Sequence, residues 1–217
     1  MSTRGVLLDV DGTLLDSNEA HATAYARAMA EEGLDVPVAR ILPLIGMGGD
    51  KLLPALGIEP NSRVGEHVAR RKKELFEEKF LPSLKPFPAT RDLLDHMKRL
   101  GLELVIATSA EGDELRGLLR RAGIEDLLDA KTSSSDANGS KPDPDILQAA
   151  IARSHFPREE LVMLGDSPYD VEAARRAGLR VVAVRCGGRS NDELKGADEI
   201  YDSPADLLAR FDDSIFV

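Results

Sequence analysis

The stretch GVLLDVDGT, residues 5–13, begins with an apolar run and ends with two carboxylates and a glycine. A short apolar run that stops at an acidic residue and a turn is typical of a buried parallel strand. Alternate side chains of a strand share one side, so Asp9 and Asp11 are expected to point the same way, and Gly12 permits the turn that follows. Carboxylates at the end of an apolar strand serve folding poorly, which favours a functional role for both.

The sequence pattern changes twice after this strand. Residues 18–81 read as helices, with no strand-like alternation. Three prolines in residues 82–88 (PSLKPFP) then mark a linker. Beyond the linker, apolar strand-like runs such as LELVIAT, LVMLGD and LRVVAVR alternate with helical segments. This alternation predicts right-handed crossovers and a parallel sheet that helices cover on both faces.

We therefore predict an α/β protein with a Rossmann-like, three-layer core formed by residues 1–16 and 83–217. Residues 17–82 are predicted to form a helical cap domain inserted after the first strand. The insertion point lies at the carboxyl end of the sheet, where open α/β sheets bind ligands.

The amino-acid composition argues against two classes of binding partner. The chain has 38 acidic and 28 basic residues and a formal net charge of -10, which disfavours nucleic acid and anionic membranes. The N-terminus does not resemble a signal peptide, and no apolar stretch approaches the roughly 18 residues of a membrane span. Cys186 is the only cysteine, so the chain cannot form an internal disulfide. We expect a cytoplasmic protein that attracts a phosphorylated metabolite through a local positive site, such as a bound metal.

Four short segments are predicted to meet at the carboxyl edge of the sheet. Two unit charges about 4 Å apart repel by roughly 4 kcal/mol at an effective dielectric of 20, so a carboxylate cluster needs a cation. Oxygen ligands of this kind favour Mg²⁺. Lys141 and the Thr108 hydroxyl are natural contacts for phosphate oxygens. The segments are residues 9–13 (DVDGT), 107–108 (AT), 140–142 (SKP) and 165–170 (GDSPYD), which supply Asp9, Asp11, Asp166 and Asp170.

These segments resemble the motifs of the haloacid dehalogenase superfamily, and in particular its capped branch of phosphoglycolate phosphatases and β-phosphoglucomutases. LLDVDGTLLDS, VIAT, SKPDPDI and MLGDSPYDVEAARRAG occur in the family's order, and the match covers essentially the whole chain. Ser140 departs from the glycine that many relatives carry there. The resemblance implies an enzyme, a phosphatase that hydrolyses small, phosphoglycolate-like monoesters, as a monomer or homodimer.

The resemblance also implies catalytic roles. Asp9 would attack phosphorus and form an aspartyl-phosphate, while Asp11 would protonate the leaving oxygen and later activate water. Thr108 and Lys141 would hold the transferring group, and Lys141 would also offset the charge of Asp9. Mg²⁺ would be bound by the Asp9 carboxylate, the Asp11 backbone carbonyl and Asp166, while Asp170 would orient these ligands or bind the ion itself.

Other candidates are less sharply defined. Ser109 and Gly12 adjoin the motifs and are further expected substrate contacts. His21 lies on an alanine-rich helix, where it either packs or faces the site and tunes Asp11. Residues 46–49 form a glycine-rich loop expected to set specificity when a cap closes. The charged stretch ARRKKELFEEK, residues 69–79, is expected to be a solvated helix face.

Three alternative functions stay open. A receiver module of phosphoryl signalling would carry its acceptor aspartate after a later strand. A phosphomutase of the β-phosphoglucomutase type is similar around Asp16, Ser17 and His21, but it would use an arginine where this chain has IGMGGDK. A phosphonoacetaldehyde hydrolase would need a Schiff-base lysine in the cap, for which Lys51 is the candidate. A fourth function, that of a dehalogenase, is disfavoured, because a dehalogenase would not need the second acid, Asp11.

Overall fold

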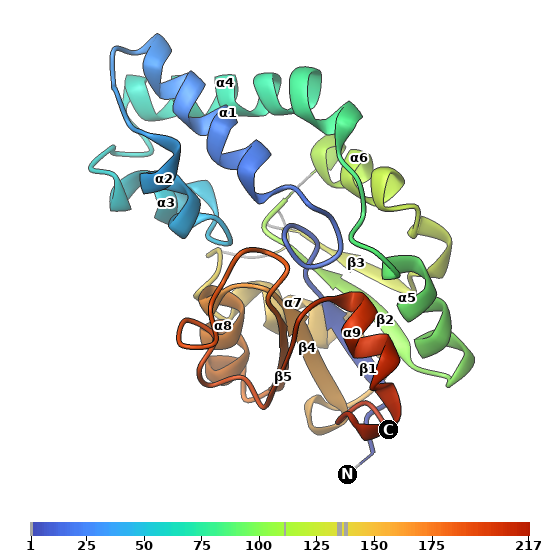
Figure 1. The fold of residues 1–217 in the computed structure, drawn as a ribbon. Helices are drawn as coiled ribbons and strands as arrows, with labels where there is room; N and C mark the ends of the chain where they lie inside the picture. The colour runs from blue at the N-terminus through green and yellow to red at the C-terminus, as the bar shows by residue number, and fades with distance from the viewer. Residues whose placement is uncertain (1, 111, 134–135, 137–138) are drawn as a thin grey trace.

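The computed structural model describes residues 2–110, 112–133, 136 and 139–217. Its centre is a six-stranded sheet with the order β3-β2-β1-β4-β5-β6, in which every neighbouring pair is parallel (Figure 1). The predicted parallel sheet is therefore confirmed. The strands are β1 (Gly5–Leu8), β2 (Glu103–Ala107), β3 (Ala130–Thr132), β4 (Leu161–Gly165), β5 (Arg180–Val184) and β6 (Glu199–Tyr201).

Helices cover both faces of the sheet, because its central strands are apolar on both sides. Leu8 of β1 packs into one core cluster with side chains of α5, α6 and α9, whereas Leu7 packs into a second cluster with those of α7 and α8. This arrangement is the predicted three-layer architecture. These helices are α5 (Thr90–Arg99), α6 (Gly112–Ala122), α7 (Asp145–Arg153), α8 (Pro168–Ala177) and α9 (Pro204–Ala209), with short 3₁₀ turns at Glu125–Leu127, Arg158–Glu160 and Phe211–Asp213.

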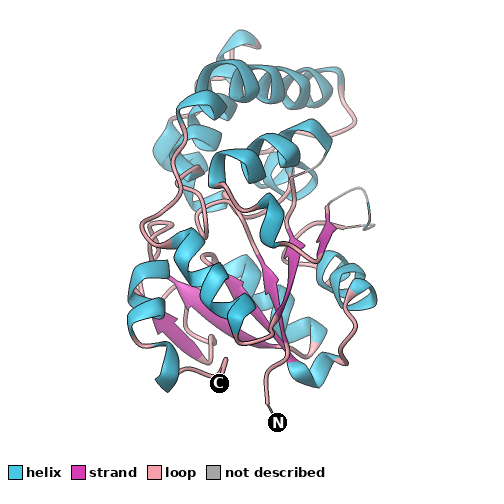
Figure 2. Cartoon of the chain, turned by 90° about the vertical axis from the view of Figure 1, so that its right-hand side faces the viewer, coloured by secondary structure: helices cyan, strands magenta, loops and turns pink. Residues whose placement is uncertain are grey.

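A second group of helices lies between β1 and β2 in the sequence and stands above the carboxyl edge of the sheet (Figures 1 and 2). It has an apolar cluster of its own, in which Met29, Leu52 and Val68 are buried. The helices are α1 (Asn18–Glu31), α2 (Val38–Ile41), α3 (Gly49–Ala55) and α4 (Arg63–Leu75), with 3₁₀ turns at Leu42–Leu44 and Leu81–Ser83 and a π-helical turn at Phe76–Phe80.

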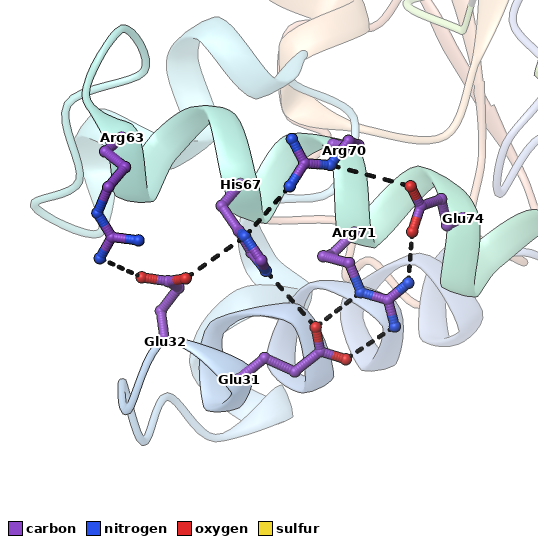
Figure 3. Close-up of polar contacts among 7 residues, drawn as sticks. All are labelled: Glu31, Glu32, Arg63, His67, Arg70, Arg71 and Glu74. Carbon is purple, nitrogen blue, oxygen red and sulfur yellow. Dashed lines mark hydrogen bonds and ion pairs between the residues drawn. The ribbon is translucent and has the colours of Figure 1, made fainter.

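Ion pairs join α4 to the end of α1 on a solvent-accessible side of this group (Figure 3). Arg71 donates to Glu31 over 2.7 Å and also binds Glu74, and Arg63 lies 2.9 Å from Glu32. Each exposed pair contributes little stability, but several together restrict how α4 can rotate about its own axis. Lys72, on another side of α4, contacts Glu114 of α6.

The α-helices are short. α1 has 14 residues and α4 has 13, whereas a bilayer core requires about 20. Within the part of the chain that the structure describes, no helix has both the length and the apolar character to cross a membrane.

Candidate active site

Strand register brings the predicted motifs to one edge of the sheet. Leu8 of β1 is level with Ile106 of β2 and Leu164 of β4, so the residues that follow these strands emerge side by side. The Asp9 amide donates to the Leu164 carbonyl over 3.0 Å and fixes this junction. Asp9 is therefore held beside the segments that carry Thr108 and Asp166.

Three of the four predicted aspartates form a buried cluster. Asp9, Asp166 and Asp170 each offer a carboxylate oxygen, and these atoms all lie within 4.8 Å of one another. Lys141, with 1% of its surface exposed, places its Nζ 2.6 Å from Asp9 Oδ1 and 2.7 Å from Asp170 Oδ1. One lysine thus serves two of the three carboxylates.

Asp166 is held by neutral donors instead. The Asn18 side-chain amide donates to its Oδ2 over 2.9 Å, and the Thr13 hydroxyl lies 3.4 Å from its Oδ1. Thr13 also donates to Asp9 Oδ2 over 2.8 Å. These contacts orient the carboxylate oxygens without neutralising them.

The charge balance of the cluster favours a bound cation. Burial, followed by repulsion from Asp170 and Asp11, raises the pKa of Asp9 to about 7, although Lys141 opposes the rise. Burial together with Asp9 and Asp170 raises the pKa of Asp166 well above its usual range. The lysine stays charged, because Asp170 and Asp9 raise its pKa against the effect of burial. Three buried carboxylates with one lysine fit a hard divalent ion, which prefers oxygen ligands.

Two glycines let backbone approach Asp166 closely. A Cβ at Gly187 would lie 1.7 Å from Asp166 Oδ2, and one at Gly12 would lie 2.3 Å from the same atom. Gly12 also has a φ of 79°, in the left-handed region. Gly12 was expected to contact substrate, but the structure places it against Asp166 and not among the residues that line the cavity.

Asp11 lines the same cavity as Asp9, and its carboxylate contacts residues at the start of α1. His21 Nε2 lies 2.9 Å from Asp11 Oδ1, and the Ser17 hydroxyl donates to the same oxygen over 2.5 Å. Burial raises the pKa of Asp11, but His21, Ser17 and Lys72 together lower it below its usual range. The sequence left open whether His21 packs or faces the site, and in the structure it does both.

His21 is fixed by stacking. Its ring lies parallel to that of Phe76, with centroids 3.8 Å apart and an interplanar angle of 9°. Phe76 is fully buried at the start of the π-helical turn that follows α4. The ring orientation of His21 is therefore set by packing as well as by the hydrogen bond to Asp11.

Asp9, Asp11 and His21 line a cavity of about 90 Å³, whereas Asp166, Asp170 and Lys141 are not among its lining residues. Thr108 and Ser109 line it from the core side, and residues 45–49 line it from the helical group. The Thr108 hydroxyl accepts from the Ala110 amide over 3.2 Å, whereas the buried Ser109 hydroxyl has no hydrogen-bond partner among the described residues. That Ser109 contacts substrate stays a prediction.

The expected solvated stretch 69–79 is only partly solvated, and that expectation was wrong for Lys72. Lys72 lines the cavity, and its Nζ lies 3.1 Å from Glu114 Oε1. The signal was present in the sequence, because Val68 and Phe76 stand four residues before and after Lys72 and both are buried. Residues spaced by four share a helix face, so Lys72 lies on the apolar face of α4.

Lys51, the candidate for a Schiff base, is placed elsewhere. Its Nζ lies 2.6 Å from Asp143 Oδ2, and its side chain is 39% exposed. It is not among the residues that line the cavity. A lysine that pairs with a surface carboxylate stays protonated, which does not suit a nucleophilic amine.

Comparisons with known proteins agree with this geometry. A family model described as haloacid dehalogenase-like hydrolase matches residues 6–184. A phosphoglycolate phosphatase of Nitrosospira multiformis is 32% identical, over 88% of each chain. The chloroplastic protein SUPPRESSOR OF QUENCHING 1 of Arabidopsis thaliana is also 32% identical, over 83% of this chain but only 18% of its own length. The crystal structure of a hydrolase from Pseudomonas syringae has a TM-score of 0.91 at 28% identity and covers 97% of this chain and 99% of its own.

Proposed function

The chain belongs to the haloacid dehalogenase-like hydrolases, and from this premise we propose that it is a Mg²⁺-dependent phosphatase of small phosphate monoesters. The observation that carries the proposal is the position of Asp9: it lines the cavity, and Lys141 holds its carboxylate at 2.6 Å. The likeness to a phosphoglycolate phosphatase supports the choice of a small ester as substrate.

We propose that Asp9 is the nucleophile. Lys141 and Thr13 hold its two oxygens by contacts of 2.6 and 2.8 Å, which fixes the carboxylate relative to the cavity. Attack on phosphorus forms an aspartyl-phosphate and breaks the bond between phosphorus and the ester oxygen. We propose that the phosphoryl oxygens are bound by the Thr108 and Ser109 hydroxyls, which line the cavity, and by the Lys141 ammonium, which contacts Asp9. Such contacts suit a reaction governed by positioning and charge.

Asp11 is the proposed acid and base. A phosphate dianion beside Asp11 raises the pKa of this carboxyl, because like charges disfavour ionisation. His21, 2.9 Å away, is placed to pass it a proton, and Asp11 then protonates the leaving oxygen. In the second half of the reaction, Asp11 takes a proton from the water that attacks the aspartyl-phosphate, which restores Asp9.

The residues proposed to hold Mg²⁺ are Asp9, Asp166 and the backbone carbonyl of Asp11. A bound Mg²⁺ supplies charge neutralisation for the phosphoryl group and for the buried carboxylates. Asp170 contacts Lys141 over 2.7 Å, and its second oxygen accepts from the Ser167 amide and hydroxyl, so we assign it an orienting role.

Residues 17–82 are proposed to act as a cap over this site. Arg189 of the core donates to the backbone carbonyls of Leu42, Pro43 and Ile45 over 3.0–3.2 Å. On the other side of the same loop, the Gly48 amide donates to the Ser140 hydroxyl over 3.1 Å. These contacts hold the loop of residues 42–49 over the cavity and support a role in excluding water during transfer.

A panel of phosphate esters tests the proposal. Purified protein with Mg²⁺ should release phosphate steadily from several small monoesters, and chelation with EDTA should abolish the release. A signalling receiver would show no sustained release, and a mutase would convert a sugar phosphate into its isomer instead. The absence of hydrolysis across the panel would overturn the proposal. A cytoplasmic location and a monomeric or dimeric state remain predictions.

A further inference from the structure

The cavity wall contains a buried ion pair that the proposed mechanism does not use. Lys72 of α4 places its Nζ 3.1 and 3.3 Å from the two carboxylate oxygens of Glu114 of α6. The two side chains are only 12% and 10% exposed. One comes from the helical group and the other from the α/β core, and both line the cavity together with Asp9 and Asp11.

The pair presents no free cation to a ligand. Burial lowers the pKa of Lys72, but Glu114, and then Tyr25, raise it above its usual range. The lysine therefore stays charged, and both carboxylate oxygens of Glu114 lie close to it. The rings of Tyr25 and Phe76 lie 5.5 and 5.0 Å from the same Nζ, so aromatic faces flank the ammonium as well.

The ion pair disfavours a leaving group that carries a negative charge. A second negative charge on the leaving group would encounter the Glu114 and Asp11 carboxylates. A charged oxygen that accepted a hydrogen bond from Lys72 would lie beside the Glu114 carboxylate, and the two like charges would repel. A hydroxyl can instead donate to Glu114 and accept from Lys72 at the same time, with the ion pair intact.

Lys72 and Glu114 line the same cavity as Asp9 and Thr108. A leaving group attached to a phosphate at Asp9 therefore lies in a cavity whose wall includes this ion pair.

We infer that Glu114 is a specificity-determining residue, which selects phosphate monoesters with a small, uncharged, hydroxylated leaving group over those that carry a second negative charge. The inference rests on the proposed phosphatase function and narrows its substrate class.

The test compares glycerol phosphate, which leaves as a neutral polyol, with phosphoglycolate, which leaves as a carboxylate. The wild-type protein should prefer glycerol phosphate in kcat/KM by at least about tenfold, because like charges at an interface cost several kcal/mol. In the Glu114→Gln variant the ratio should shift toward phosphoglycolate by at least about tenfold, mainly through a lower KM for phosphoglycolate.

Glu31→Gln is the matched control. Glu31 also pairs with a basic residue of α4, Arg71 at 2.7 Å, but on the solvent-accessible side shown in Figure 3. This variant removes the same charge from the protein without altering the cavity, so the ratio should stay at the wild-type value. A wild-type preference for phosphoglycolate, or a ratio in Glu114→Gln within twofold of wild type, would overturn the inference.

A binding experiment without turnover separates this inference from the proposed function. Titration calorimetry of the two esters against Asp9→Asn, with and without Glu114→Gln, measures charge selection in the absence of turnover. If the wild type hydrolyses no ester of the panel but the Kd ratio shifts with Glu114, the phosphatase proposal fails while charge selection by Glu114 stands. A Kd ratio that does not respond to Glu114, or the failure of both esters to bind, would refute it.

Discussion

Lys141 lies 2.6 Å from Asp9 and 2.7 Å from Asp170, so a single buried ammonium joins the proposed nucleophile to the start of α8. Asp170 is fixed in turn by a reciprocal capping interaction with Ser167 at the N-terminus of that helix. The position of the Asp9 carboxylate therefore depends on the SKPDPDI motif, which supplies Lys141. Through Asp170 it also depends on the MLGDSPYDVEAARRAG motif. Asp166, the remaining member of the cluster, pairs with no lysine in the described part of the chain.

Replacing Lys141 by Met should lower kcat/KM by about a hundredfold to a thousandfold, because the transferring group loses a preorganised cation. The change also leaves two buried carboxylates unpaired, which costs about 3–5 kcal/mol of stability in metal-free protein. Steady-state kinetics and urea unfolding with and without Mg²⁺ measure the two effects. Equal stability of the variant and wild type without metal would contradict the assigned contacts.

The stabilising effect of Mg²⁺ should increase with pH. Asp9 and Asp166 have raised pKa values in the folded, metal-free protein, so the folded state binds more protons than the unfolded chain. Metal-free stability is therefore greatest below the unfolded pKa near 4, and it falls as pH rises through the folded value of about 7 for Asp9.

Differential scanning calorimetry from pH 5 to 8 checks this dependence. Each pKa unit by which Mg²⁺ lowers a carboxyl pKa is worth about 1.4 kcal/mol, or about 3–6 °C in Tm for a chain of this size. We predict a small shift in Tm with Mg²⁺ at the acidic end and a larger one at the alkaline end. A shift that is constant across the range would rule out these carboxylates as the ligands.

Asp11→Asn should lower kcat by about a hundredfold to ten-thousandfold, as expected when a general acid is lost. His21→Gln should have a smaller effect and should move the pH dependence of kcat, since glutamine can donate a hydrogen bond but cannot pass a proton. If the pH profiles of wild type and His21→Gln coincide, His21 does not pass a proton to Asp11 and acts only through its hydrogen bond and its packing.

Gly187→Ala should weaken Mg²⁺ binding by about tenfold to a hundredfold, in the range seen when the surroundings of metal ligands are altered. The added methyl group would lie 1.7 Å from Asp166 Oδ2, so that carboxylate must move. Gly188→Ala is the control, because its Cβ would meet no atom within 4 Å although its φ of 94° is strained. Equal losses in the two variants would indicate strain in the loop and not displacement of Asp166.

The sheet and the acidic cluster could be predicted because both follow from short-range patterns. Apolar runs such as Leu161–Gly165 are buried on both faces, and strand ends in a parallel sheet must meet at one edge. Asp9 and Asp166 each directly follow such a run, so their convergence required no knowledge of side-chain packing.

The residues that the sequence did not reveal depend on packing between distant segments. Asn18 reaches Asp166 only because the turn after β1 folds back over the sheet edge. Lys72 enters the cavity because α4 is held against α1 and is thereby turned toward Glu114. Lys72 stands in a run of mixed charges, which resembles a solvated face. The buried residues Val68 and Phe76, which share its side of α4, are a weak signal against that interpretation.

The covalent role of Asp9 is tested most directly by mass spectrometry of protein that has been quenched in acid during turnover with a hydrolysed ester and Mg²⁺. We predict one phosphoryl group on the peptide that contains Asp9, and none on the same peptide from the Asp9→Asn variant. Sustained phosphate release by Asp9→Asn, or a phosphoryl group on a different residue, would contradict the account.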